Sequence, residues 1–275
     1  MKQRLNLLLV AVALIVFTSC ENNKVNGKHR SEKNVTTSVK EKISEKDCKD
    51  IHWSHHKGEE GPENWQNLCD GFADCGGKVQ SPINIVTKNV KSDVKLLTPD
   101  FSYDKSKVDI INNGHTVHFN ISGNNSVKLN GKTYKLLQFH YHALSKHTIN
   151  GKHFPIEVHF VHKYDGGDYA VIGIMFKEGN ENNLLNKYLN KFPKIKGEYK
   201  SDDMVNLLSL LPKNRDYFNY SGSLTTPPCS EVVNWYVLKN PITASKRQIE
   251  QFSKILNHNY RPIQPLNDRK IKSNM

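Results

Sequence analysis

The sequence has 275 residues, and 39 Lys and Arg against 27 Asp and Glu give a formal net charge of +12. Apolar residues make up 37% of the chain, and the 16 glycines bring the total close to the globular norm. These values exclude a collagen, a coiled coil and a wholly disordered chain, and they allow one large domain or two small ones.

The first 20 residues are typical of an export signal. Two basic residues precede an apolar run over residues 7–17, which is too short to cross a bilayer comfortably. Ser19 directly before Cys20 is typical of a bacterial lipoprotein signal, whereas Phe17 suits an ordinary signal peptidase poorly. We therefore expect residues 1–19 to be removed and Cys20 to carry a lipid. A soluble secreted protein with a spare cysteine is the alternative.

Residues 20–47 are expected to form a flexible tether. Residues 21–46 contain seven Lys or Arg, four Glu and only four sizeable apolar side chains. Such a stretch buries too little surface to offset its ordering entropy. Its excess of basic residues also allows contact with an anionic surface, but a solvated spacer is the simpler interpretation. The chain is thus predicted to be exported to a bacterial cell envelope, in the periplasm or as an outer-membrane lipoprotein.

Four further cysteines follow, at Cys48, Cys69, Cys75 and Cys229. An even number of cysteines in an exported protein favours disulfides over free thiols. None of them forms a C-x-x-C metal or redox motif, and their spacing alone leaves all three pairings open.

From residue 48 onward, short apolar runs are separated by Gly, Asn, Asp and Pro, and several runs alternate with a period of two, which predicts strands. In the predicted strand 134–142, the even-numbered residues would share one face and the odd-numbered residues the other. Further strands are predicted over residues 155–163, 169–176 and 232–238.

Helices are predicted to be few. Residues 184–192 carry one amphipathic face, and Ser245 with Gln248 forms a capping box that opens another helix. Residues 48–270 contain no internal repeat and no linker, so we expect one sheet-dominated domain there, followed by a tail over residues 271–275.

Three histidines in two predicted strands form a candidate metal site. His140 and His142 are two residues apart in one strand, so their side chains leave the same face. His159, which shares a face with Glu157, lies in the next strand, after a connection long enough for an antiparallel return. Three protein ligands with one open position are the catalytic zinc arrangement. Imidazole also suits other transition metals, and the alternative for His-x-His is an ordinary polar strand face.

Seven sequence blocks then point to one known family. They occur in this order: Trp53 with Gly61-Pro62-Glu63-Asn64-Trp65, Gln80-Ser81-Pro82-Ile83-Asn84-Ile85, Asn112-Asn113-Gly114-His115, Gln138-Phe139-His140-Tyr141-His142, Glu157-Val158-His159-Phe160-Val161-His162, Ser223-Leu224-Thr225-Thr226-Pro227-Pro228-Cys229, and Arg261-Pro262-Ile263-Gln264-Pro265-Leu266. On these blocks the chain resembles the α-class carbonic anhydrases from Trp53 to Arg269. The resemblance implies a mainly β domain with a few short helices, built on a large central, mostly antiparallel twisted sheet.

The resemblance also implies an activity, the zinc-dependent reversible hydration of carbon dioxide to bicarbonate and a proton. Zn²⁺ would be held by His140, His142 and His159, and zinc-hydroxide would attack the substrate, as is established for carbonic anhydrases. Thr225 would aim that hydroxide, and His115 would shuttle the released proton to buffer.

Further residues match supporting roles in the family. Glu157 and Gln138 would orient the zinc ligands through their ring nitrogens, and Asn113 and Tyr220 would hold the waters of the proton path. The substrate pocket would be lined by Val161, Val171, Leu224, Thr226, Val233 and Trp235. For the apolar members of this set, core packing is the alternative role. The resemblance also implies a disulfide between Cys75 and Cys229, which leaves Cys48 and Cys69 as a second pair.

The chain departs from the family at two positions. His55 stands where the family usually has a tyrosine, and we expect it to be an extra titrating group. Lys146 stands where the family has the glutamate that accepts the proton of the threonine hydroxyl. A charged lysine can only donate, so we expect it to misdirect Thr225 and reduce turnover, and we expect Lys146→Glu to raise the rate several-fold. The alternative is normal turnover, with the lysine side chain turned to solvent and a water or another glutamate accepting the proton.

Lys146 therefore leaves an alternative function open, a catalytically weakened or noncatalytic zinc-binding member of the family. Ester hydrolysis is expected only as a side activity. The predicted partners are carbon dioxide and bicarbonate, and the membrane through a lipid anchor at Cys20. A nucleic-acid partner is not expected, because the sequence contains no recognition helix or stacking motif. The oligomeric state is not readable from the sequence, and a homodimer is one alternative.

Overall fold

The computed structural model describes residues 48–193 and 195–274. The predicted signal segment, Cys20 and the predicted tether lie outside these residues. Within the described residues, no helix is long and apolar enough to cross a membrane.

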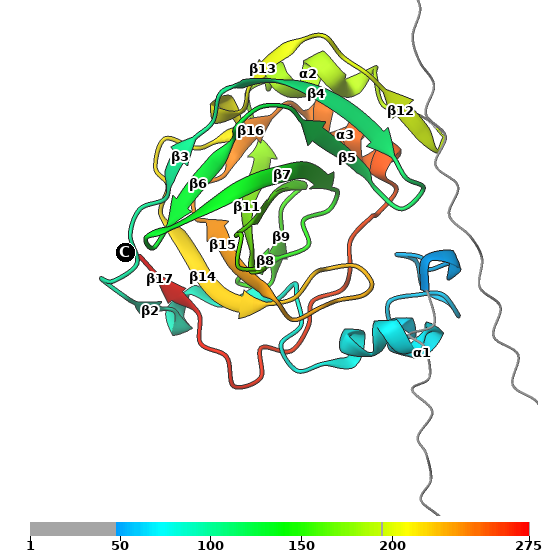
Figure 1. The fold of residues 1–275 in the computed structure, drawn as a ribbon, viewed down its shortest axis with the longest axis vertical. Helices are drawn as coiled ribbons and strands as arrows, with labels where there is room; N and C mark the ends of the chain where they lie inside the picture. Colours follow the sequence, from blue (N-terminus) through cyan, green and yellow to red (C-terminus); the bar gives the residue numbers. More distant parts are fainter. Residues whose placement is uncertain (1–47, 194, 275) are drawn as a thin grey trace, which may run out of the picture. The chain divides into compact units, whose positions relative to one another are not determined.

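Strands dominate the described part of the chain and form one 14-stranded mixed sheet, strongly twisted in Figure 1. Its main path runs in the order β12 (Gly197–Tyr199), β4 (Lys105–Asn112), β5 (Val117–Ile121), β7 (Lys132–His142), β10 (Ile156–Lys163), β11 (Tyr169–Glu178), β15 (Val233–Leu238), β14 (Tyr217–Gly222), β17 (Lys272–Ser273) and β2 (Lys91–Ser92). The strands off this path are β3 (Asp100–Ser102), β6 (Ser126–Leu129), β13 (Met204–Asn206) and β16 (Ile242–Ala244). Most pairings are antiparallel, and β11 pairs in parallel with β15 and β16. The predicted fold class is confirmed.

The remaining elements are short. A small sheet contains β1 (Asn84–Ile85), β8 (Thr148–Ile149) and β9 (Lys152–His153). The α-helices are α1 (Trp65–Leu68), α2 (Asn183–Leu189) and α3 (Lys246–Leu256), and the 3₁₀ helices are η1 (Cys48–Asp50), η2 (Asp70–Gly76), η3 (Thr87–Asn89) and η4 (Leu207–Leu210). The predicted capping box of Ser245 and Gln248 opens α3. A cap that the sequence analysis missed opens α2, where the Asn182 side chain accepts two backbone N–H bonds.

Residues on the two faces of the sheet enter different cores. In β11, Ile172, Ile174 and Phe176 join the larger core with α2 and α3, whereas Val171 and Met175 join a smaller core on the opposite face. This strict alternation follows from the period of two in a strand.

The simple alternation predicted for β7 is wrong in its first half. Leu137 is 41% exposed, and Tyr134 and Leu136 lie in the same core as Phe139 and Tyr141. The register between β7 and β10 shifts at this point: Val161 pairs with Gln138, but the next residue, His162, pairs with Leu136, so Leu137 is skipped. A β-bulge therefore reverses the faces of β7 just before the histidine pair.

Disulfides join Cys48 to Cys69 and Cys75 to Cys229, as expected. The second bond ties the N-terminal segment to the loop that follows β14, which carries Thr225. The C-terminal boundary differs from the expectation. Ile271 is buried in the smaller core, and β17 pairs with β14 and β2, so the domain continues beyond residue 270.

A buried histidine outside the site predicts how stability depends on pH. His162 lies 2.7 Å from the Tyr103 hydroxyl through Nε2 and 3.0 Å from Phe160 O through Nδ1, and burial lowers its pKa to about 3. Between pH 6.5 and 3 the unfolded chain binds a proton there that the folded protein does not, so acid favours unfolding by about 1.4 kcal/mol per pH unit. We expect His162→Gln to reduce the pH dependence of the unfolding free energy by that amount between pH 6.5 and 3. Urea titrations at several pH values would measure it. The control is His258→Asn, at an exposed residue with a left-handed backbone, and an unchanged slope in the His162 variant would contradict the assignment.

Candidate metal centre

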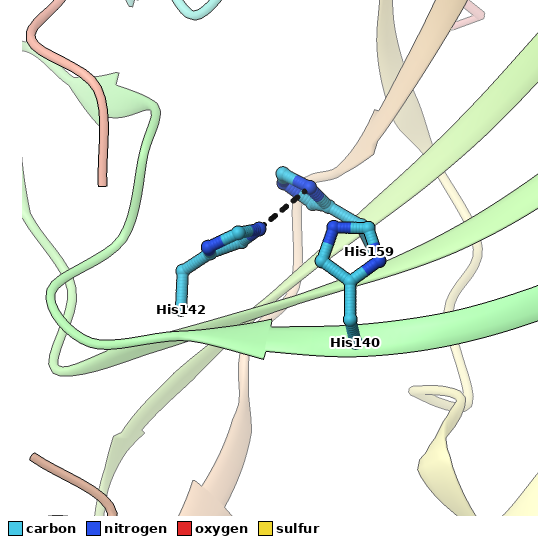
Figure 2. A group of neighbouring side chains, drawn as sticks. All are labelled: His140, His142 and His159. Atoms are coloured by element: carbon cyan, nitrogen blue, oxygen red, sulfur yellow. Dashed lines mark hydrogen bonds between the residues drawn. The ribbon is translucent and has the colours of Figure 1, made fainter. Parts of the chain in front are cut away.

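Neighbouring strands bring the three predicted histidines together. His140 pairs with His159 across β7 and β10, and Glu157 pairs with His142. Figure 2 shows the three rings converging from these two strands. The predicted antiparallel return of the second strand is confirmed.

Each of the three rings has one nitrogen bound to an oxygen acceptor outside the cluster. These hydrogen bonds run from His140 Nδ1 to Gln138 Oε1 (3.0 Å), from His142 Nδ1 to the Asn259 backbone oxygen (2.9 Å), and from His159 Nε2 to Glu157 Oε1 (2.8 Å). Because an oxygen acceptor requires the proton on the nitrogen that faces it, the opposite nitrogen of each neutral ring carries a free lone pair. The acceptor from Asn259 was not predicted, since a backbone oxygen leaves no mark in the sequence.

The free nitrogens fit a tetrahedral cation. The ligand atoms of the three histidines lie within 4.8 Å of one another, and His142 Nε2 is 3.2 Å from His159 Nδ1. Two nitrogens at about 2.0–2.1 Å from one tetrahedral zinc ion are separated by about 3.3 Å. Two lone pairs that face each other at this distance repel unless a cation lies between them. The donor set and its spacing therefore suit Zn²⁺.

The protonation states also favour metal binding. Burial lowers the pKa of His140 and His142 well below the usual histidine value. Burial lowers the pKa of His159 as well, although Glu157 opposes this shift. All three rings are therefore neutral near pH 7, as a metal ligand requires.

Glu157 is the buried carboxylate that organises one side of the site. It accepts hydrogen bonds from His159 Nε2 and from the backbone N–H and Nδ1 of His147, at 2.7–2.9 Å. Burial alone would raise the pKa of Glu157, but its interactions with these two histidines, which donate hydrogen bonds to it, hold the pKa well below its usual range. A β-carbon at Gly173 would lie 2.9 Å from Glu157 Oε1, so glycine there leaves room for the carboxylate.

The sequence analysis gave no role to His147, which the structure buries between Glu157 and Tyr220. His147 Nε2 lies 2.6 Å from the Tyr220 hydroxyl, which also lies 3.0 Å from Ser81 Oγ. Tyr220 therefore supports the Glu157 side of the site and does not line the cavity, in contrast to the expected water-holding role. The only sequence signal for His147 was its place in the loop after the His-x-His strand.

A cavity of about 320 Å³ opens over the three histidines. Its wall includes most of the predicted substrate residues, which are Val161, Val171, Leu224, Thr226 and Trp235. Val233, which is buried in the same core cluster as Val171 and Trp235, is not among the residues that line the cavity. Gln138, Asn113 and Thr225 also line the cavity. Asn113 Oδ1 additionally accepts the backbone N–H groups of His115 and Thr116, so this side chain fixes the turn that carries His115.

His115 lies in a neighbouring hollow, with its ring stacked on Trp53 at 4.1 Å between ring centres. It is partly buried, and burial with the nearby His52 lowers its pKa. The ring is therefore neutral and able to accept a proton near pH 7.

His55 lines the cavity itself, but the structure contradicts its expected role as an extra titrating group. Burial lowers its pKa to about 2, so it stays neutral at physiological pH.

Lys146 contacts Thr225 through its side-chain amine. Its Nζ is 2.8 Å from Thr225 Oγ1 and 3.1 Å from the Thr225 backbone oxygen, and the lysine is fully buried. The predicted contact between these two residues is therefore present.

Comparisons with known proteins agree with this geometry. The family described as eukaryotic-type carbonic anhydrase matches residues 60–275. A carbonic anhydrase of Pectobacterium atrosepticum is 43% identical over 227 residues, which cover 80% of this chain and 90% of the relative. A carbonic anhydrase of Neisseria gonorrhoeae is 40% identical over 223 residues, covering 80% and 87% of the two chains.

A solved structure is similar along nearly its whole length. It is the α-carbonic anhydrase from Thermovibrio ammonificans in complex with the inhibitor sulfanilamide, with a TM-score of 0.77 and 43% identity over 81% of this chain and 99% of that one. The chain belongs to the α-class carbonic anhydrase family.

Proposed function

We propose that this carbonic anhydrase hydrates carbon dioxide reversibly at a zinc ion held by His140, His142 and His159, with His115 as its proton shuttle. One observation supports the proposal most strongly. Three neutral imidazoles point their free nitrogens at one place, at the base of a cavity with an apolar wall. A weakly polar substrate can rest on that wall next to the open metal position.

In carbonic anhydrases, a zinc ion held by three histidines lowers the pKa of its bound water to about 7, an established property of the family, and so supplies a hydroxide nucleophile near neutral pH. The residues of this chain provide orientation. Glu157 and Gln138 fix two of the three rings by hydrogen bonds to the nitrogens that do not face the metal. Thr225, at the cavity wall, is placed to receive a hydrogen bond from the nucleophile and to direct its lone pair at the substrate.

Metal removal tests this proposal. Exchange of ¹⁸O between carbon dioxide and water at chemical equilibrium reports the chemical step without net proton release to buffer. We expect a strong chelator to abolish catalysed exchange, one equivalent of Zn²⁺ to restore it, and Mg²⁺ to have no effect because it prefers oxygen ligands. Catalysed exchange that persists in the metal-free protein would refute the zinc assignment.

His115→Ala is expected to lower net hydration about tenfold or more at low buffer concentration, as is typical of losing a proton-transfer group. Added imidazole should restore much of the rate, because it can carry the proton in place of the missing ring. The ¹⁸O exchange between carbon dioxide and bicarbonate should change little. An equal loss at every buffer concentration would show that His115 has another role.

We also propose that the protein is a lipoprotein of a bacterial envelope, anchored through Cys20. The two disulfides are typical of proteins from an oxidising compartment, and the signal segment supplies the lipid-bearing cysteine. The lipid should be detectable by fatty-acid labelling, and Cys20→Ser should lose both label and membrane association. Labelling of the Cys20 variant would contradict the anchor.

A second candidate is a weakened or noncatalytic zinc-binding member of the family. One observation favours it, the contact of Lys146 with Thr225 at the position where a carboxylate is expected. The charge of Lys146 therefore decides between full and reduced turnover.

A further inference from the structure

Lys146 is one of the largest fully buried side chains of the described residues. Its amine contacts two oxygens, both of Thr225. An ammonium group has three N–H donors and no acceptor, whereas a neutral amine has two N–H donors and one lone pair. Thr225 offers one backbone acceptor and one hydroxyl that can donate. With these two partners either form leaves one N–H without an acceptor among the described residues. The ammonium would in addition bury an unpaired charge, which costs far more than a buried neutral amine.

The surroundings of Lys146 also oppose a charge. No carboxylate of the described residues forms an ion pair with Lys146, and Glu157 already accepts three hydrogen bonds from His147 and His159. The titratable and charged groups that face Lys146 are Arg261, Glu157, His55, His140, His142 and His159. Burial first, and then Arg261, lowers the pKa of the amine well below its usual range, although Glu157 opposes this shift. A divalent cation in the histidine site would add further positive charge nearby.

We propose that Lys146 is a neutral amine that accepts the hydroxyl proton of Thr225 and donates one N–H to the Thr225 backbone oxygen. Thr225 Oγ1 then turns its lone pairs to the cavity, with the same polarity that a carboxylate at residue 146 would impose. Lys146 is thus a positioning residue for the hydration reaction. The inference rests on the proposed zinc chemistry, and it replaces the expectation that a charged lysine misdirects Thr225.

The charge of Lys146 can be measured without any assay of activity. The Nζ chemical shift in NMR spectra of protein labelled with ¹³C and ¹⁵N in lysine distinguishes an amine from an ammonium. At pH 7.5 we expect one lysine in the neutral form, in both the metal-free and the zinc-loaded protein, and we expect its signal to be absent from Lys146→Gln. A spectrum in which every lysine is an ammonium at pH 7.5 would overturn the proposal.

Four variants test the hydrogen-bond polarity. Lys146→Gln keeps an acceptor and a donor, and Lys146→Glu keeps an acceptor, so both should retain kcat/KM within about threefold of the wild type. Lys146→Arg imposes a cation that cannot be neutralised, and we expect a loss of about 100-fold with normal zinc content. Lys146→Met has a similar volume but removes both the hydrogen-bond acceptor and the hydrogen-bond donor, so it should also lose activity. A several-fold gain in Lys146→Glu would show that the native lysine misdirects Thr225 and would overturn the proposal.

Inhibitor binding provides a readout that a purely structural role would not change. A primary sulfonamide can donate its N–H to Thr225 Oγ1, whereas thiocyanate carries no hydrogen. We expect Lys146→Gln to keep the wild-type ratio of the two affinities, and Lys146→Arg to weaken the sulfonamide about tenfold or more relative to thiocyanate. The proposal would be contradicted if a soluble, zinc-loaded Lys146→Arg had the same ratio of sulfonamide affinity to thiocyanate affinity as Lys146→Gln. If Lys146→Arg does not fold, the same affinity ratio is measured in Lys146→Met, where we also expect the sulfonamide to weaken about tenfold or more relative to thiocyanate.

The outcomes separate this inference from the proposed function. Hydration that does not depend on zinc refutes the function, and the NMR measurement still reports the charge of Lys146. Zinc-dependent hydration together with a charged Lys146 leaves the function intact and refutes the inference.

Discussion

His142→Ala is expected to lose stoichiometric zinc binding and to lower kcat/KM for carbon dioxide hydration by about three orders of magnitude or more. His142 supplies one of the three free nitrogens and faces His159 Nδ1 at 3.2 Å. Without a bound ion, the nucleophile must come from ordinary water, whose pKa lies far above the value near 7 that is known for the zinc-bound water of carbonic anhydrases. Metal analysis and stopped-flow hydration would measure the two losses.

The fold should survive this change, because the core and both disulfides are independent of the metal site. A matched control is His118→Ala. His118 lies on β5 directly opposite His140 and lines the same cavity, but it is not among the clustered ligand atoms. We expect the control to keep one zinc per chain. Full zinc content with normal turnover in His142→Ala would remove the proposed ligand set.

Thr225→Val is expected to lower kcat/KM about 100-fold with zinc content unchanged. The substitution keeps the shape of the side chain but removes the hydroxyl that lies 2.8 Å from Lys146 Nζ at the cavity wall. Losing one preorganised hydrogen bond to a reacting oxygen costs about 2.7–4 kcal/mol, which corresponds to this change in rate. Stopped-flow kinetics at constant zinc occupancy would measure it.

Thr226→Val is the control for this prediction, because it makes the same chemical change at the next residue of the loop, and Thr226 also lines the cavity. No hydrogen bond joins its hydroxyl to Lys146, whose described contacts are both with Thr225. We expect its effect to stay below about tenfold. Equal losses in the two variants would show that Thr225 has no special orienting role.

The ligand cluster could be predicted because its geometry is local. A period of two places His140 and His142 on one face, and a short return brings His159 opposite His140. The same rule failed a few residues earlier, where the bulge at Leu137 reverses the faces of β7. A bulge depends on pairing with another strand, so alternation within one segment does not reveal it.

Some of the groups that support the ligands are reached only through contacts that are distant in sequence. His142 is oriented by the backbone of Asn259, 117 residues away, and Tyr220 reaches His147 across 73 residues. Motif similarity indicated that Tyr220 belongs to the site, but it assigned the residue to the wrong side.

Charge states were the least predictable property of the site. The sequence shows that Lys146 and His55 replace family residues, but their pKa values depend on burial and on neighbours from several segments. His55, expected to titrate, is held neutral by burial. The same physical effect underlies our proposal that Lys146 orients Thr225 and does not misdirect it.

We propose that the three-histidine centre catalyses carbon dioxide hydration with zinc. Stopped-flow hydration during a titration of the metal-free protein with Zn²⁺ tests it most directly. We predict that turnover rises in proportion to bound zinc and reaches its plateau at one zinc per chain. A protein that binds one zinc per chain and hydrates carbon dioxide no faster than the buffer alone would contradict it.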